Sequence, residues 1–285
     1  MDRSISSDGR EPGSAGQMAR DIPPSRQLEP REKPTSDRDR PSVARKEREY
    51  QITESERESL TQIGRFRTLS VGDLARYQYA GNTAKMGQDL RHLISQRLLR
   101  SQTIWLGKNK EMLTVAALTK RGKSLLEKSG ETSTLYAGFV KPAEMRHDAA
   151  IYGMYQAEAA RISTSGGQIR RLTLDYELKR NVYSLLAKEK PGTAVYKKRQ
   201  AEIASEHGLK VVRGHIQLPD LRIEYQSRNG EIAHRDLELA TNHYRGGQLA
   251  AKADAGFTFY ASAADATRLS SVFDDHHITA EILSL

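Results

Sequence analysis

Residues 98–126 read LLRSQTIWLGKNKEMLTVAALTKRGKSLL, and this stretch decides the fold. A β-prone Thr-Ile-Trp run is followed by a Gly-Lys-Asn-Lys turn and then by a second apolar run. This pattern predicts a β-hairpin with Lys108 and Lys110 at its tip. A helix that closes the unit is predicted to begin after Thr119.

Three helices are predicted upstream of this hairpin. The first spans Thr53 to Phe66, opens with a cap-like Thr-Glu-Ser-Glu and places its apolar residues at helical spacing. Ser70 is expected to cap a short second helix, and after a turn the third helix runs from Thr83 to Gln96. The side chains of this third helix that are expected to face inward are Met86, Leu90, Leu93 and Ile94.

A helix-turn-helix followed by a hairpin and a closing helix resembles the winged helix-turn-helix of bacterial regulators. In that motif the helix after the turn enters the major groove of DNA, so its outward polar side chains reach bases and phosphates. Some winged helices bind protein instead. The candidate DNA-binding residues are Lys85, Gln88, Arg91, His92, Arg97, Lys108, Lys110, Lys120 and Arg121.

The charge imbalance of the chain falls on the same unit. The formal net charge is +9, and residues 51–130 hold 14 Lys and Arg against 7 Asp and Glu, whereas the segments on either side are nearly balanced. A basic excess confined to one small unit is typical of proteins that neutralise the phosphates of a polyanion. The expected partner is therefore double-stranded DNA.

Residues 1–50 are expected to form a disordered tail. They hold most of the nine prolines and few apolar residues, too few to offset the entropy lost on ordering. The sequence has no cysteine, no secretory signal after Met1 and no run long enough to span a bilayer. A cytoplasmic protein that does not contact membranes is expected. Nucleotide-driven activity is not expected, because the sequence lacks a Gly-Lys-Ser/Thr phosphate-binding loop.

Residues 131–146 are rich in Ser, Thr, Gly and Lys and predict a linker, after which residues 147–285 predict an α/β domain. A helix is expected from Arg146 to Ile162, and two strands joined by a polar turn are expected at residues 218–225 and 235–241. The fold class is therefore α+β, a winged helix followed by an α/β domain with a mixed sheet. The other expected elements are a strand at 169–176, helices at 176–187, 195–208, 244–256 and 264–273, and strands at 257–261 and 278–283.

The two strands and the helix after them resemble the core of PD-(D/E)XK nucleases. Pro219-Asp220 precedes the hairpin, and Glu238 lies on its second strand within the sequence RDLELAT. Joined to the winged helix and to the helix that begins RHDAAI, the chain over residues 55–262 is similar to the replication-relaxation family of plasmids and integrative elements. This resemblance implies an accessory role in replication, relaxation or transfer, with replication or relaxation proteins of the same element as partners.

The resemblance also implies a role for individual side chains. Metal-dependent hydrolysis of a phosphodiester uses carboxylates that converge on Mg²⁺ and a lysine nearby, and Asp220 and Glu238 match the two carboxylates. The lysine expected two residues after the second acid is absent, because position 240 is Ala. Lys252 or Gln248 on the next helix is the candidate replacement. Additional acids on preceding elements are Glu158 and Glu177.

Because this lysine is missing, the sequence predicts a domain that keeps the nuclease-like fold without the catalytic activity, so no cofactor is expected. Mg²⁺ is needed only if the protein is an active nuclease. Asp220 and Glu238 are still expected to lie close together, with Lys252 or Arg245 offsetting their repulsion and no open metal position. Without the resemblance, Asp220 is simply a turn residue at a strand start and Glu238 an outward strand residue.

Three functions stay open from the sequence. The first is a DNA-binding accessory protein with a nuclease-like domain that does not cleave. The second is a metal-dependent endonuclease that the winged helix targets to DNA. The third is a transcriptional regulator whose C-terminal domain senses a ligand or dimerises, and a homodimer is compatible with each of them.

Overall fold

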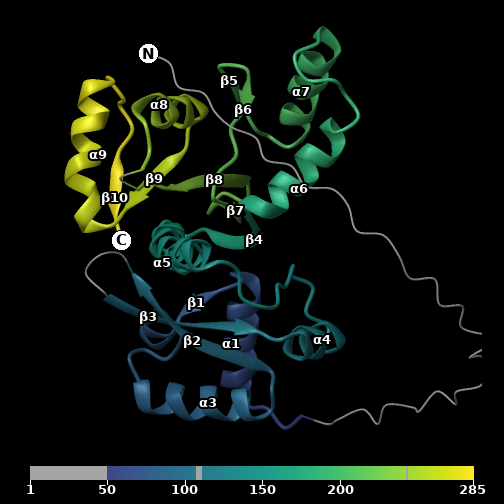
Figure 1. The fold of residues 1–285 in the computed structure, drawn as a ribbon, viewed down its shortest axis with the longest axis vertical. Coiled ribbons are helices and arrows are strands. Elements are labelled where there is room, and N and C mark those ends of the chain that lie inside the picture. The colour runs from purple at the N-terminus through teal and green to yellow at the C-terminus, as the bar shows by residue number, and fades with distance from the viewer. Residues whose placement is uncertain (1–49, 107–110, 242) are drawn as a thin grey trace, which may run out of the picture. The chain divides into compact units, whose positions relative to one another are not determined.

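The computed structural model describes residues 50–106, 111–241 and 243–285. Within these ranges the chain is mixed α+β, as predicted, with a three-stranded, a five-stranded and a two-stranded sheet (Figure 1). Residues 1–49 of the predicted tail and the wing-tip residues Lys108 and Lys110 lie outside the described residues. In the described ranges, no helix has both the length and the apolar character needed to cross a membrane.

The first sheet belongs to a helix-turn-helix with a hairpin wing and a closing helix, which is the arrangement that the sequence predicts. Its strands are antiparallel in the order β1-β3-β2, and α3 follows the turn. The elements in chain order are α1 (Glu54–Arg65), β1 (Leu69–Ser70), α2 (Val71–Asp73), the π-helical turn η1 (Leu74–Gln78), α3 (Thr83–Ser95), β2 (Leu99–Leu106), β3 (Glu111–Leu118) and α4 (Lys120–Lys128).

Capping side chains fix where these helices begin. Thr53 and Glu56 form a capping box at the start of α1, with Thr53 N donating to Glu56 Oε2 at 2.8 Å and Glu56 N donating to Thr53 Oγ1 at 3.3 Å. Ser70 caps α2 and Asn82 caps α3, each by accepting a hydrogen bond from a backbone amide three residues on. The predicted caps at Thr53 and Ser70 are confirmed.

The apolar stripe of α3 faces the core of this unit. Met86, Leu90 and Leu93 are buried, as predicted. The prediction for Ile94 is wrong, because its side chain is 39% exposed. Successive residues of an α-helix are rotated by about 100°, so a residue directly after the buried Leu93 is carried to the edge of the stripe.

The five-stranded sheet has the order β10-β9-β8-β7-β4. Strands β4, β7 and β8 pair antiparallel, whereas β8, β9 and β10 pair parallel, so the sheet is mixed, as predicted. The strands are β4 (Gln168–Leu174), β7 (Leu221–Gln226), β8 (Ile232–Leu239), β9 (Thr258–Ala261) and β10 (Ile282–Ser284).

Five helices accompany this sheet in the described ranges. Their bounds are α5 (Pro142–Thr164), α6 (Asp175–Leu186), α7 (Ala194–Glu206), α8 (Gly246–Ala255) and α9 (Ala263–Asp275). Helix α5 begins at Pro142, before the predicted Arg146, because proline is favoured in the first turn of a helix. A short hairpin of β5 (Val211–Val212) and β6 (His215–Ile216) was not predicted, since strands of two residues leave little periodicity to detect.

Helix α5 packs against both larger sheets and lies between them in Figure 1. Its Tyr152 is fully buried and meets the ring of Phe66 edge to face, with centroids 5.1 Å apart. The segment before α5 also packs on the first unit, with Tyr136 N donating to Gly64 O at 2.8 Å and Gly138 N donating to Leu118 O at 2.7 Å. A single hydrophobic core therefore runs from α1 through α5 to β7 and β8.

Candidate functional site

Helix α3 presents an exposed polar face, and Gln88 and Arg91 lie on it. Neither side chain forms a hydrogen bond or ion pair with another residue in the described part of the chain. An arginine that is not held by an acid can donate to phosphate oxygens or to the O6 and N7 atoms of guanine. These two residues are therefore available as DNA contacts on α3.

Lys85 and His92 lie on the same helix, but acids already engage them. Lys85 Nζ is 3.1 Å from Asp89 Oδ2 and also donates to Ser55 Oγ at 2.9 Å. His92 Nδ1 is 2.5 Å from Oε1 of the buried Glu56. These contacts fasten α3 to α1, so part of the binding capacity of Lys85 and His92 is used within the protein.

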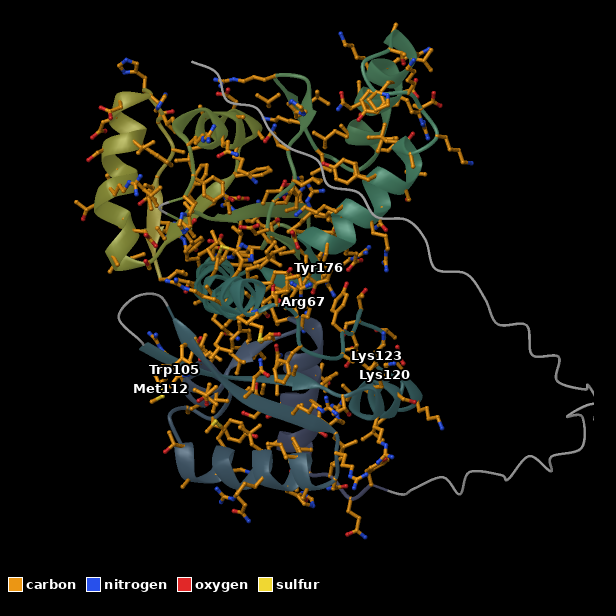
Figure 2. The ribbon with its side chains drawn as sticks, in the orientation of Figure 1. Arg67, Trp105, Met112, Lys120, Lys123 and Tyr176 are labelled. Carbon is orange, nitrogen blue, oxygen red and sulfur yellow. The ribbon has the colours of Figure 1, made fainter. Side chains whose placement is uncertain are left out.

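The remaining described candidates, Arg97, Lys120 and Arg121, are exposed where α3 leads into β2 and where α4 begins. Thr119 joins the two segments, because its Oγ1 donates to Arg97 O at 2.7 Å. Figure 2 shows Lys120 on the opposite side of the view from Trp105, which lies on the wing. The predicted contacts that lie within the described residues therefore form two groups, the α3 face and this basic corner.

In the C-terminal half, Asp220 and Glu238 come together on neighbouring strands. Asp220 directly precedes β7 and is braced against β8, since its backbone N donates to Leu237 O at 3.0 Å and its Oδ2 accepts from Leu239 N at 2.9 Å. Glu238 lies between these two β8 residues and is completely buried. The alternative interpretation of Glu238 as an outward strand residue is therefore wrong.

Lys252 of α8 reaches the same place. Its Nζ lies 2.7 Å from Glu238 Oε2 as an ion pair and donates a hydrogen bond to Leu218 O at 2.9 Å. The expected convergence of Asp220, Glu238 and Lys252 is observed. Arg245 is exposed and does not take part, and Gln248 caps α8 by accepting from Arg245 N at 3.1 Å.

Two residues of this cluster were not predicted. Tyr244 OH donates to Glu238 Oε1, and His147 Nε2 of α5 lies 3.4 Å from Asp220 Oδ2. Tyr244 stands in the turn before α8, where the predicted helix was placed too early, so its direction could not be inferred from periodicity. His147 belongs to the RHD sequence at the start of a predicted helix, but nothing in the spacing of that sequence indicates Asp220 as a partner.

The two additional acids that the resemblance suggested are engaged elsewhere. Glu158 accepts a hydrogen bond from Tyr260 OH at 2.6 Å, and Glu177 pairs with Arg171 at 3.0 Å. Neither residue contacts Asp220 or Glu238. The acid pair is therefore completed by a histidine, a lysine and a tyrosine.

Burial and neighbouring charges shift the pKa values of Glu238, Asp220 and His147 away from their ordinary values. Burial and the neighbouring Asp220 charge raise the pKa of Glu238 to about 7. Burial opposes ionisation of Asp220 as well, but His147, the Leu239 amide and Lys252 outweigh it and lower the pKa of Asp220. Burial disfavours the charged form of His147, yet Asp220 outweighs that effect and raises the pKa of His147.

The arrangement does not fit Mg²⁺, which requires near-octahedral coordination by oxygen. Both oxygens of Glu238 already face positive or donating groups, Lys252 and Tyr244. Asp220 Oδ2 faces the Leu239 amide and His147. Among residues 50–106, 111–241 and 243–285, no group of three His, Asp or Glu side chains could hold a metal ion.

No protein-family model matches the chain, and no curated protein matches it. One solved structure that matches is the crystal structure of Bacillus subtilis PadR in complex with operator DNA, at 14% sequence identity and a TM-score of 0.23, covering 54% of this chain and 93% of the PadR chain. Similarity of this degree does not establish a shared fold.

Proposed function

We propose that this chain is a duplex-DNA-binding protein that docks on DNA through α3. The observation that carries this proposal is that Gln88 and Arg91 lie exposed on the helix that follows the turn of a helix-turn-helix. Neither side chain pairs with another residue in the described structure. This face belongs to the unit with 14 basic against 7 acidic residues. Phosphate neutralisation by such a unit provides affinity, and the α3 side chains provide base contacts.

The C-terminal half is proposed to be a nuclease-like module that does not cleave DNA. The order α5, β4, β7, β8, α8, β9 and the position of Asp220 and Glu238 on adjacent strands support the resemblance to the PD-(D/E)XK core. Ala240 stands where that core has its lysine, and Lys252 neutralises Glu238 directly. A carboxylate held in this way is unsuited to coordinating a metal ion.

The biological role follows from the sequence resemblance to replication-relaxation proteins. We place this chain with the accessory proteins of plasmids or integrative elements that control replication, relaxation or transfer. Its partners are then duplex DNA and the replication or relaxation proteins of the same element. The buried cluster stabilises the C-terminal module in this view.

A metal-dependent endonuclease is the second candidate, and the convergence of Asp220, Glu238 and Lys252 favours it. Calorimetric titration of the protein with Mn²⁺ separates the two candidates. The proposed role predicts no micromolar binding. Micromolar binding that Glu238→Ala abolishes would replace the non-cleaving module with a nuclease.

A gel-shift and nicking experiment on supercoiled plasmid DNA that contains a replication origin tests the whole proposal. The protein should shift the DNA with or without Mg²⁺ or Mn²⁺ and leave it supercoiled. Failure to shift any duplex would contradict DNA binding. Nicking that needs the metal and is lost in Glu238→Ala would leave DNA binding in place and establish cleavage.

A further inference from the structure

A cavity of about 310 Å³ lies where the end of α1, the segment after α4, strand β4 and the start of α6 meet. Three arginines line it, Arg65 of α1 and Arg170 and Arg171 of β4, together with one carboxylate, that of Glu177. The charges of the lining side chains therefore sum to two positive charges. The lining includes neither the buried acid cluster of β7 and β8 nor the polar face of α3, so the cavity is a separate feature of the molecule.

A register shift in β4 places two consecutive arginines at this cavity. Strand β4 pairs regularly with β7 except between Ile169 and Arg171, which leaves Arg170 as an extra residue in the strand. Adjacent residues of a regular strand point to opposite faces, whereas a bulge turns a side chain away from its regular direction. Bulges are frequent beside functional sites for this reason. The irregularity in β4 thus lets the cavity have a pair of neighbouring guanidinium groups.

The three guanidinium groups keep N–H donors that a ligand can use. Arg65 forms no hydrogen bond or ion pair with another described residue. Arg170 Nη2 donates to Oε1 of Gln226, a neutral group that leaves the arginine charge uncompensated. Arg171 pairs with Glu177 through Nη2 at 3.0 Å, and a guanidinium group has five N–H donors in all. The cavity can therefore hold an anion without breaking these contacts.

An aromatic side chain with a buried hydroxyl group also lines the cavity. The Tyr136 hydroxyl oxygen is buried and makes no hydrogen bond of normal geometry in the described structure. Its ring meets that of Tyr176 edge to face, with centroids 4.4 Å apart. A buried polar atom without a partner is rare in native proteins, and a bound ligand is one way to satisfy it. Phe66, Leu172 and Leu174 add apolar surface to the lining.

Size and charge together select the class of ligand. A cavity of about 310 Å³ is at the lower end of the range for small-molecule sites, which suits a compound no larger than a nucleoside monophosphate. A phosphate monoester carries nearly two negative charges at pH 7, which matches the two positive charges of the lining. Guanidinium groups bind phosphate oxygens through paired N–H donors. A monocarboxylate would leave one of the positive charges unmatched.

We infer that this cavity binds a small organic phosphate monoester, with its phosphate on Arg170 and Arg171 and its organic part against Tyr136. The inference goes beyond the proposed DNA binding and does not depend on it, because the polar face of α3 lies outside the cavity. A ligand in this position contacts both α1 and β4, so its binding should stabilise the packing of the first unit on the five-stranded sheet.

Isothermal titration calorimetry of the full-length protein in the absence of DNA tests the inference with AMP, GMP and glucose 6-phosphate. At least one of these esters should bind with a Kd of about 0.1 mM or lower, and inorganic phosphate should bind about tenfold more weakly than that ester. If inorganic phosphate binds as tightly as all three esters, the cavity holds an adventitious ion only. That result would overturn the inference, and so would the failure of all three esters to bind at millimolar concentration.

Substitution of Arg170 locates the binding. Arg170→Gln removes one guanidinium group at an exposed strand position and should weaken binding of the ester by about tenfold or more. Arg268→Gln is the matched control, because Arg268 is an exposed arginine of α9 that does not line the cavity. If the ester binds both variants as tightly as it binds the parent protein, the phosphate is not bound at β4 and the inference is wrong.

Tyr136→Phe separates ligand binding from a structural role. The variant loses only a hydroxyl group that has no hydrogen bond of normal geometry in the described structure, so the melting temperature of the ligand-free protein should stay the same or rise. Affinity for the ester should fall by about fivefold, because a hydrogen bond to the ligand is lost. A lower melting temperature with unchanged affinity would show that the hydroxyl supports the fold and overturn its place in the site.

Duplex DNA is the other source of phosphate groups for these arginines. Arg170→Gln should bind duplex DNA as tightly as the parent protein does. If the three esters fail to bind and Arg170→Gln weakens duplex binding, the arginines contact the DNA backbone, so the inference is wrong while the proposed function stands. If the parent protein binds no duplex but binds an ester, the proposed function is wrong and the inference stands.

Discussion

Arg67 donates from Nε and Nη2 to both carboxylate oxygens of Asp148, at 2.5 and 2.9 Å, and so ties the turn after α1 to helix α5. Asp148 is buried, and the Arg67 guanidinium carbon lies 4.7 Å from the centre of the Tyr176 ring (Figure 2). Arg67 has a φ of 66°, a left-handed conformation that is uncommon outside glycine. The bidentate pair with Asp148 holds the Arg67 side chain in place, while the Arg67 backbone keeps this left-handed conformation.

Arg67→Ala should therefore be strongly destabilising. It leaves the buried Asp148 carboxylate without its cation, and breaking a buried pair in this way costs about 3 kcal/mol. Urea unfolding of the two proteins measures the difference. Glu54→Ala is the control, because it breaks the exposed Arg57–Glu54 pair of α1 and should leave the unfolding midpoint unchanged. Equal midpoints for both variants would show that Arg67 does not anchor α5.

Stability should fall as pH rises from about 5 to 8. The pKa of Glu238 is about 7 in the folded protein against an ordinary value of 4.5 for a glutamate, so the folded state binds more protons between these values. The stabilisation that Glu238 provides is fully present below the pKa that this residue has in the unfolded chain. It is lost as the pH rises through the pKa that it has in the folded protein. His147 acts in the same direction, because its pKa is raised as well. The lowered pKa of Asp220 acts only in more acidic solution.

Urea midpoints measured across this pH range check the dependence. Glu238→Gln should flatten it, since the amide cannot titrate. Glu231→Gln, at an exposed position in the β7–β8 turn, should retain the full slope of the parent protein. If the urea midpoint of Glu238→Gln changes with pH as steeply as that of the parent protein, other groups cause the pH dependence.

Lys252→Met should destabilise the protein more at pH 8 than at pH 5. The variant keeps the two buried carboxylates but loses the cation 2.7 Å from Glu238 Oε2, and their repulsion is greatest when both are ionised. The double variant Lys252→Met with Glu238→Gln should recover most of the loss at pH 8, because it removes the uncompensated charge. Thermal unfolding of the single and double variants at the two pH values measures this recovery. If the double variant loses the sum of what the two single variants lose, Lys252 and Glu238 are not coupled.

Local signals in the sequence predicted the helices and the hairpin well. The capping box at Thr53, the Ser70 cap and the β-prone runs on either side of the wing turn act over a few residues, so one sequence suffices to detect them. The approach of Asp220 to Glu238 was predictable for a similar reason, because a hairpin joins their strands. Asp89 was not recognised as the partner of Lys85, although it lies one helical turn away.

The missed features depend on contacts between distant segments. His147 meets Asp220 only because α5 packs on β7 and β8, and no residue spacing records that packing. The packing of Tyr136 and Gly138 on the first unit is equally nonlocal, since polar composition alone made their segment a linker. The left-handed Arg67 has no local marker either, because glycine is the residue that usually signals this conformation.

The DNA-binding role is tested most directly by the salt dependence of duplex binding in Arg91→Ala. Removing one phosphate contact should weaken binding and reduce the slope of log affinity against log salt by about one. Lys85→Ala should have a smaller effect, because Asp89 already holds that ammonium group, and Arg268→Ala, at an exposed position of α9, should have none. If Arg91→Ala and Arg268→Ala bind duplex DNA with the same affinity and the same salt slope, α3 is not the DNA-binding face.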